Sequence, residues 1–341
     1  MGSFINRLNI ARDFLGGRER SAGAPLELSI ELTSECNLVC CMCPRDDNAK
    51  RGLGYMTFDT FRRIIDETAT GLEFAYLHLA GEPLLHPEFE RFIDYAAEQG
   101  VHTGISTNGT ILSKRRAKRL LASSLDTLII SIDGTDAETY KRIRGANSFN
   151  KVVRNTEGFL DLKEEAGKGP FVVIQMICME ENHRQAKDFC RRWKRAGVNA
   201  VRLKRFFNFA GQVADMSPEI NDKMAVNNKP PKPCMLPWRQ LAFYYDGTAV
   251  ACCHDFLHET ELGNIHQHSL EEIWNSTAMR EVRRCHVEGR KDDIDLCAGC
   301  NQPEISLIQL MGLTLMNGRL AKRSLITAER IANRLGLGPL Y

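Results

Sequence analysis

Six short apolar runs alternate with amphipathic segments between residues 26 and 206, and this rhythm constrains the fold more than any other feature of the chain. The runs are rich in Val, Ile, Leu and Phe, as strands buried on both faces of a parallel sheet are. They cover residues 26–32, 74–79, 101–106, 127–132, 171–177 and 200–204. Between them, apolar residues recur at helical spacing, as at Phe58, Phe61 and Ile65. Six strand–helix repeats predict an α/β fold, a partial (β/α)6 TIM-like barrel.

A change of composition near residue 227 predicts a domain boundary. The segment NNKPPKPCMLP at residues 227–237 clusters prolines, which favour an extended linker over a helix. Beyond it, two apolar runs flank Asp246-Gly247, a pair typical of hairpin turns, and helices are expected at residues 269–275 and 279–286. The expected parts are a helical extension at residues 1–24, the barrel at 25–226, a small α+β domain at 227–305 and a helical tail at 306–341.

Composition excludes several classes of protein. With 341 residues, 43% of them hydrophobic, the chain can bury a full core and is not expected to be disordered. The net charge of +2 leaves no overall field to hold a polyanion, so we expect no nucleic-acid partner. A long apolar run and a signal peptide are both missing, which predicts a cytoplasmic protein without a membrane partner. Twelve cysteines in such a chain predict thiolates that bind metal rather than disulfides.

Four of these cysteines follow the first predicted strand, in the stretch Cys36-Asn-Leu-Val-Cys40-Cys41-Met42-Cys43. Cys36, Cys40 and Cys43 can hold three irons of a [4Fe-4S] cluster and leave the fourth iron without a protein ligand. An open iron can chelate the amino and carboxylate groups of S-adenosylmethionine, so that an electron from the cluster cleaves the adjacent sulfonium. Zinc is the alternative, although it usually needs a fourth ligand close by. Cys41 is expected to be a non-ligand thiol, because adjacent residues on a tight loop point apart.

This motif and its place after the first strand resemble the radical SAM superfamily, whose members generate a 5′-deoxyadenosyl radical in this way. The resemblance covers residues 26–206. It implies that Glu82 binds the methionyl amine and that Gly81 permits close approach, although Ala80 replaces the first glycine of the family's motif. It also implies further cofactor contacts from Met42, Asn108, Ser131, Asp133 and Arg144. Asn108-Gly109 and Asp133-Gly134 are also ordinary turn formers, and that interpretation stays open.

A second set of cysteines lies in the C-terminal part, at Cys234, Cys252 and Cys297-Ala-Gly-Cys300. One cysteine before a hairpin, one at its end and a closing Cys-x2-Cys pair resemble the SPASM and twitch extensions of radical SAM proteins. The resemblance implies one auxiliary [4Fe-4S] cluster held by these four thiolates, because no cysteine follows Cys300 to support another cluster. Cys253 is the alternative to Cys252. Structural zinc also takes four thiolates, so a non-enzymatic zinc-binding module is a further alternative.

Together these features predict a radical SAM oxidoreductase that cleaves S-adenosylmethionine reductively and abstracts a hydrogen from its substrate. Residues 1–24 leave no room for a peptide-recognition domain, so we expect a small polar substrate, like a sugar or an aminocyclitol, with the auxiliary cluster as electron acceptor. The alternative is a maturase of a ribosomal peptide or protein. An external low-potential electron donor, such as flavodoxin or ferredoxin, is expected as a partner. Residues that could line the substrate cavity are Gln175, Arg202 and Lys204, and no catalytic acid or base is assigned.

Overall fold

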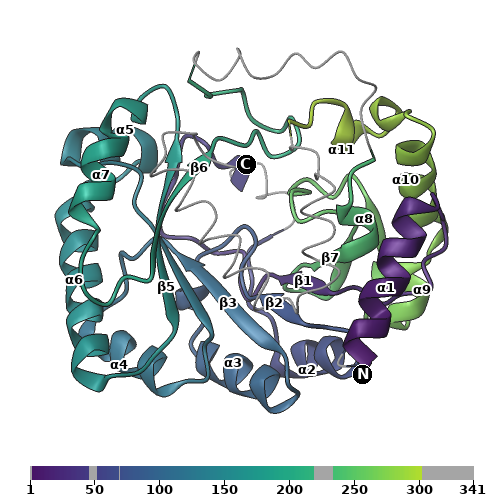
Figure 1. Cartoon of the computed structure of the whole chain (residues 1–341), viewed down its shortest axis with the longest axis horizontal. Helices are drawn as coiled ribbons and strands as arrows, with labels where there is room; N and C mark the ends of the chain where they lie inside the picture. The colour runs from purple at the N-terminus through teal and green to yellow at the C-terminus, as the bar shows by residue number, and fades with distance from the viewer. Residues whose placement is uncertain (1, 46–51, 69, 219–232, 302–341) are drawn as a thin grey trace.

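The computed structural model describes residues 2–45, 52–68, 70–218 and 233–301, and within them nine strands form one sheet. The strand order is β6-β5-β4-β3-β2-β1-β7-β8-β9. Strands β1 to β6 run parallel to one another, and the sheet stays open as an arc with helices on its outer side (Figure 1). The expected α/β fold with a partial barrel is confirmed.

Strands and helices alternate through the barrel as predicted. The strands are β1 (Glu27–Ile30), β2 (Phe74–Tyr76), β3 (His102–Thr107), β4 (Thr127–Ser131), β5 (Phe171–Cys178) and β6 (Ala200–Arg205). The helices between and after them are α2 (Phe58–Thr68), α3 (Phe89–Glu98), α4 (Lys114–Ala122), α5 (Ala137–Arg144), α6 (Phe149–Ala166) and α7 (Ala186–Arg192). Each predicted apolar run overlaps one of these strands.

The main core lies between the sheet and the outer helices. Leu28, Ile105 and Ile174 from the strands and Phe61 and Phe92 from the helices are fully buried there. Because side chains alternate along a strand, the residues between the core residues point to the inner side of the arc. Polar residues in these inner positions are Ser29, Ser106, Ser131 and Gln175. The barrel therefore has an apolar outer face and a partly polar interior.

The predicted C-terminal hairpin is present and extends the barrel sheet. Strand β7 (Gln240–Phe243) pairs antiparallel with β8 (Thr248–Val250), and Gly247 between them has a φ of 86°, which favours glycine. Strand β7 also pairs in parallel with all four residues of β1. A further strand that was not predicted, β9 (Glu261–Asn264), pairs with β8. The C-terminal part thus adds strands to the β1 edge of the barrel.

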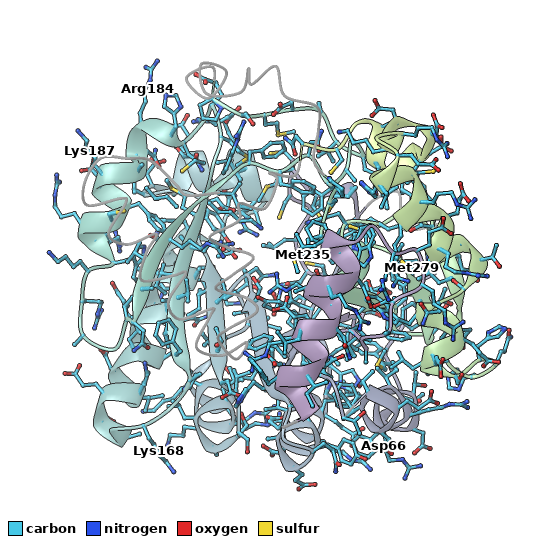
Figure 2. The ribbon with its side chains drawn as sticks, turned by 45° about the vertical axis from the view of Figure 1, so that its right-hand side comes forward. Asp66, Lys168, Arg184, Lys187, Met235 and Met279 are labelled. Carbon is cyan, nitrogen blue, oxygen red and sulfur yellow. The ribbon has the colours of Figure 1, made fainter. Side chains whose placement is uncertain are left out.

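Helix α1 (Gly2–Leu15) packs against the C-terminal part, and Figure 2 shows it running beside the C-terminal helices. The indole N–H of Trp238 donates a hydrogen bond to the carbonyl oxygen of Arg18 at 2.8 Å. Two of the C-terminal helices, α9 and α10, were predicted. The remaining elements are α8 (Leu236–Arg239), α9 (Leu270–Trp274), α10 (Thr277–Val287), α11 (Asp295–Ala298) and the 3-10 turns η2 (Pro83–Leu85), η3 (His183–Gln185) and η5 (Lys291–Asp293).

An extended linker was expected as far as residue 237. This is wrong for the last two residues, which belong to a helix. Helix α8 begins at Leu236 and has Pro237 in its first turn, where the missing N–H of proline removes no helical hydrogen bond. The linker residues up to 232 and the expected tail at 306–341 lie outside the described residues. In the part of the chain that is described, no helix combines the length and apolar character that a membrane span requires.

Candidate active site

The first cysteine loop (residues 36–43) follows β1 and brings three thiols together. Cys36, Cys40 and Cys43 are partly buried, whereas Cys41 is exposed. The N–H of Cys43 donates to the carbonyl oxygen of Cys40 at 3.1 Å, and the N–H of Cys41 donates to that of Ile143 at 2.9 Å. Burial raises the pKa of Cys43 to about 12, and the nearby charges of Cys40 and Cys36 add to this rise. Three partly buried thiols therefore share one loop, and the non-ligand role of the exposed Cys41 stays a prediction.

Two glycines allow the backbone to pack tightly around this loop. A Cβ on Gly81 would overlap the carbonyl oxygen of Thr33, just before the loop. A Cβ on Gly145 would overlap the carbonyl oxygen of Val39, within the loop, and Gly145 also has a φ of 70°. Gly81 was predicted to permit close approach. In the structure, the segment that approaches Gly81 is the backbone at Thr33, just before the cysteines. Gly145 was missed, although a glycine directly after a helix is a familiar end signal.

Glu82 is buried beside the first cysteine loop. Its carboxylate accepts hydrogen bonds from the hydroxyl of Thr107 at 2.7 Å and from the backbone N–H groups of Asn108 at 2.8 Å and Leu84 at 3.2 Å. Burial raises the pKa of Glu82, and these hydrogen bonds oppose the rise. Burial is the main cause that raises the pKa of Cys36, and the negative charge of Glu82 adds to this rise. A carboxylate is thus held next to the loop, and its contact with the methionyl amine stays a prediction.

Asn108 braces the same loop from the end of β3. Its side-chain Nδ2 donates to Oδ1 of Asn37 at 3.0 Å and lies 3.9 Å from Sγ of Cys36. Its Oδ1 accepts from the backbone N–H of Thr110 at 2.9 Å. Asn108 therefore acts as a turn former and also supports the first cysteine loop, and its contact with the cofactor stays a prediction.

Arg144 and Asp133 form a buried ion pair that reaches the cysteines. Arg144 Nη2 lies 2.6 Å from Asp133 Oδ2, and Arg144 Nη1 lies 3.7 Å from Sγ of Cys40. The other oxygen of Asp133 accepts from the backbone N–H of Ile177 at 2.8 Å. Although burial alone would lower it, the charge of Asp133 raises the pKa of Arg144 above its ordinary value. The fully buried Asp133 thus holds the guanidinium group of Arg144, a permanent cation, beside the loop.

The two remaining predicted cofactor contacts are Met42, within the loop, and Ser131, at the end of β4. Ser131 ends β4, and its hydroxyl lies 3.4 Å from that of Ser106 on β3. Met42 is buried in an apolar cluster with Ile143 and Phe206. The structure therefore places Ser131 on the inner side of the barrel and packs the Met42 side chain away from solvent. Their contacts with a cofactor remain predictions.

The second cysteine set also gathers in space, from segments that are far apart in the chain. Burial raises the pKa of Cys234 to about 12, and the charges of Cys300 and Cys253 add to it. Burial likewise raises the pKa of Cys297 to about 12, with added effects of Cys234 and Cys300. Cys252 and Cys253 are hydrogen-bonded to each other, so both lie at this site and the choice between them as ligand stays open. Among the described residues, no group of three His, Cys, Asp or Glu side chains is close enough together to hold a single metal ion.

His286 joins the second cysteine set and was not predicted. Its ring lies between Cys234 and Cys297, and only 6% of the residue is exposed. Burial lowers its pKa to about 4, and the charge of Lys291 acts in the same direction. The sequence offers no signal for this placement, because His286 lies on a helix without any metal-binding spacing to the cysteines.

The bridging segment (residues 206–216), which follows β6, contacts both cysteine sites. Toward the first loop, Phe206 packs with Met42, and Val213 and Met216 pack against the same apolar cluster, as does Cys40. The segment thereby covers the apolar side of the first cysteine loop.

Toward the second cysteine set, the bridging segment uses hydrogen bonds. The Asn208 side chain donates to the carbonyl oxygen of Gly299 at 2.7 Å, and the Gln212 side chain donates to that of His254 at 2.8 Å. Phe209 has a φ of 49°, a left-handed conformation that residues other than glycine seldom adopt. The bridging segment therefore links the two cysteine sites. Apolar contacts join it to the first loop, hydrogen bonds join it to the second set, and its backbone is strained at Phe209.

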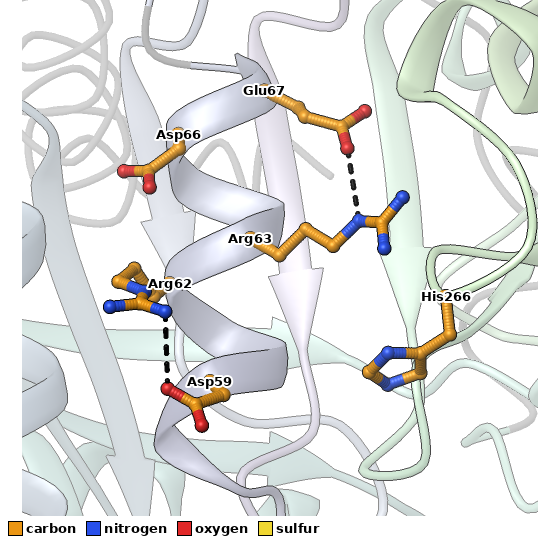
Figure 3. A pocket seen from close by; sticks show the side chains of 6 residues that line it. All are labelled: Asp59, Arg62, Arg63, Asp66, Glu67 and His266. Atoms are coloured by element: carbon orange, nitrogen blue, oxygen red, sulfur yellow. Dashed lines mark hydrogen bonds and ion pairs between the residues drawn. The ribbon is translucent and has the colours of Figure 1, made fainter.

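A separate surface pocket lies on helix α2, outside the barrel (Figure 3). Its charges are largely paired within the helix: Arg62 lies 3.3 Å from Asp59, and Arg63 lies 3.2 Å from Glu67. None of the predicted site residues lines it. We interpret this pocket as a solvated helix face, like the outward-pointing charges of Lys168, Arg184 and Lys187 in Figure 2.

The two cysteine sites coincide with two family matches. The chain matches the radical SAM superfamily over residues 30–192 and the SPASM iron–sulfur cluster-binding domain over residues 234–301. The chain is a radical SAM protein with a SPASM domain. Its cofactors are therefore S-adenosylmethionine and iron–sulfur clusters, as predicted. The donor set fits them, since one loop offers three thiols for an open cluster and the second set offers enough for a closed one. The family match favours iron–sulfur clusters over the zinc alternative.

Curated relatives and solved structures resemble this chain. It is 33% identical to the mycofactocin maturase MftC of Mycobacterium ulcerans over 213 residues. These residues cover 61% of this chain and 54% of that protein. It thus spans about half the length of this relative. It is 26% identical over 320 residues to the tungsten-containing aldehyde ferredoxin oxidoreductase cofactor-modifying protein of Pyrococcus furiosus, covering 80% of this chain and 88% of that protein.

Two solved structures show the same fold at low sequence identity. Streptococcus suis SuiB bound to its precursor peptide SuiA has a TM-score of 0.61 at 17% identity, covering 76% of this chain and 67% of SuiB. BtrN in complex with AdoMet and 2-DOIA has a TM-score of 0.54 at 18% identity, covering 82% of this chain and 93% of BtrN. At such identities the likeness concerns the fold alone.

Proposed function

We propose that this radical SAM protein modifies a ribosomally made peptide or protein. The observation that carries the proposal is the 33% identity to a mycofactocin maturase over 213 residues. This replaces the expected sugar or aminocyclitol substrate, for which BtrN offers only a likeness of fold at 18% identity. A short segment before the barrel does not exclude a peptide substrate, because a separate protein can supply peptide recognition.

The first cysteine loop is the proposed site of S-adenosylmethionine cleavage, with Cys36, Cys40 and Cys43 as ligands of the open cluster. When bound, the cluster supplies the electron that cleaves the sulfonium and so yields the 5′-deoxyadenosyl radical. Arg144 supplies a cation 3.7 Å from the Cys40 sulfur, which suits the carboxylate of the cofactor. Glu82, buried nearby, suits its ammonium group.

The second cysteine set is the proposed site of one auxiliary cluster, held by Cys234, Cys297, Cys300 and either Cys252 or Cys253. A cluster with four protein ligands has no open iron for a substrate, so its proposed role is electron transfer. An external low-potential donor such as flavodoxin or ferredoxin is the proposed source of electrons.

The inner side of β5 and β6 is the proposed place of substrate contact. Gln175 on β5 lies opposite Arg202 on β6, and Lys204 follows two residues later on the same face. The charge of Lys204 acts on Cys253, and the charge of Arg202 acts on Tyr76, which is on the inner side of β2. These basic side chains therefore lie toward the space between the two cysteine sites, where a substrate has to meet the radical.

Anaerobic reconstitution tests this function. The protein should bind about eight irons per chain, as two [4Fe-4S] clusters require. With S-adenosylmethionine and a reductant it should release 5′-deoxyadenosine, and replacing Cys36, Cys40 and Cys43 with Ala should abolish that release. Cys41→Ala is the matched control, because this thiol of the same loop is exposed.

The substrate class is tested by isotope transfer. Deuterated precursor peptides from neighbouring genes should pass deuterium into 5′-deoxyadenosine and change mass. Deuterium transfer from an aminocyclitol or a sugar, with none from any peptide, would refute the peptide proposal and leave the radical chemistry intact.

A further inference from the structure

His286 is aimed at one ligand position of the second cysteine set. Its Nδ1 lies 3.5 Å from the backbone nitrogen of Cys234, and its Nε2 lies 3.6 Å from Sγ of Cys297. Both nitrogens of this buried ring therefore face cysteine residues. The role of each nitrogen as donor or acceptor depends on which of them carries the proton.

The contact with Cys234 settles the tautomer. A backbone N–H can only donate, so Nδ1 of His286 has to accept from Cys234. The proton of a neutral imidazole then sits on Nε2, which faces the sulfur of Cys297. The ring is thus arranged to donate an N–H···S hydrogen bond.

Helix α10 is fixed so that this orientation is kept. The buried Arg283, one turn before His286, donates from Nε to the carbonyl oxygen of Pro237 at 2.9 Å and from Nη1 to that of Glu19 at 2.9 Å. Pro237 lies three residues after Cys234, in helix α8. Arg283 therefore ties α10 to the short stretch of chain that carries Cys234, and it keeps the ring of His286 in place.

We propose that His286 is a positioning residue that donates to the Cys297 thiolate and raises the reduction potential of the auxiliary cluster. A hydrogen-bond donor directed at a ligating sulfur stabilises the added negative charge of the reduced cluster more than the oxidised one. A higher potential favours acceptance of an electron from a substrate radical. The inference rests on the proposed ligand role of Cys297 and is independent of the substrate.

Redox titration of the auxiliary cluster tests this proposal. The full chain with Cys36, Cys40 and Cys43 replaced by Ala carries only the auxiliary signal, which electron paramagnetic resonance follows at set potentials. His286→Leu removes the donor and should raise the ratio of oxidised to reduced cluster about tenfold at a fixed potential, about 59 mV for one electron. His286→Gln keeps a side-chain N–H donor and should stay within about threefold of the parent. His268→Leu, which removes an exposed histidine of the same domain, is the control.

A second comparison covers the case in which His286→Leu binds no auxiliary iron. His286→Asn keeps an acceptor for Cys234 but is too short to reach Cys297, so its potential should fall below that of His286→Gln. Equal potentials in all variants would overturn the proposal. A shifted potential without peptide modification would refute only the proposed substrate, whereas peptide modification with unchanged potentials would refute only the role of His286.

Discussion

At the scale of single residues, the two glycines beside the first cysteine loop have different physical requirements. Gly145 needs both space and a positive φ of 70°, so a side chain there would meet two penalties. Gly81 has no such φ and needs only space, because its Cα faces the carbonyl oxygen of Thr33. Gly81 therefore offers a purely steric test of how tightly the loop is held.

Gly81→Ala should destabilise the protein and loosen the first cluster. A methyl group would push against backbone atoms that cannot rotate away, at a cost of about 1–3 kcal/mol in the free energy of unfolding. Urea denaturation of the metal-free chain measures this cost, and iron content measures the loss at the first site. Gly158→Ala is the control: nothing lies within 4 Å of its added Cβ on helix α6, so it should stabilise by about 0.5–1 kcal/mol. Equal behaviour of the two variants would contradict the steric argument.

At the scale of elements, the bridging segment differs from an ordinary connecting loop. It has apolar contacts with the first cysteine loop and hydrogen bonds with the second cysteine set. Its left-handed Phe209 and Ala210 cost backbone energy that only the surrounding contacts can offset. The polar contacts are therefore expected to hold the second site more than the first.

Replacing Asn208 and Gln212 with Ala should impair the auxiliary cluster selectively. Each lost hydrogen bond removes about 1 kcal/mol that holds the loops carrying Gly299 and His254. Iron content and resonance spectra should show a weaker auxiliary signal and an unchanged signal from the first cluster. Gln267→Ala, at an exposed position of the same domain, should change neither signal. An equal loss of both signals would argue against this division of contacts.

At the scale of the whole molecule, the barrel and the C-terminal part share one sheet. Strand β7 pairs with β1, and the side chain of Gln240 donates to the hydroxyl of Ser29 at 2.7 Å. Arg239 and Glu27 form an ion pair at 2.7 Å across the same junction, with side chains 16% and 7% exposed. The two parts should therefore unfold together rather than one after the other.

Arg239→Met should lower the stability of both parts equally. It leaves the charge of Glu27 in a buried place without this ion pair, which typically costs about 3–5 kcal/mol. Fluorescence of Trp193 reports on the barrel, whereas Trp238 and Trp274 report on the C-terminal part, so single-reporter variants separate the two in urea. Both midpoints should fall together, and adding Glu27→Gln should restore part of the loss. A shift confined to one reporter would show that the parts unfold independently.

Much of the barrel could be predicted because its signals are local. Apolar runs and helical spacing reveal strands and helices wherever a segment is buried on a regular pattern. The three cysteines proposed as ligands of the open cluster are close in sequence, so their spacing alone indicated a common site. Glu82 and Arg144 were singled out only by family resemblance. The contacts that hold them, from Thr107 and from Asp133, became visible only in the folded chain.

Spacing along the chain determined which segments form strands and which thiols share a loop, because both depend on neighbours in sequence. It did not reveal that β7 adds to β1, that the bridging segment joins the two cysteine sites, or that His286 faces Cys297. These features depend on packing between segments that are far apart in the chain. No periodicity records such packing, so it was established only when the helices and strands came together.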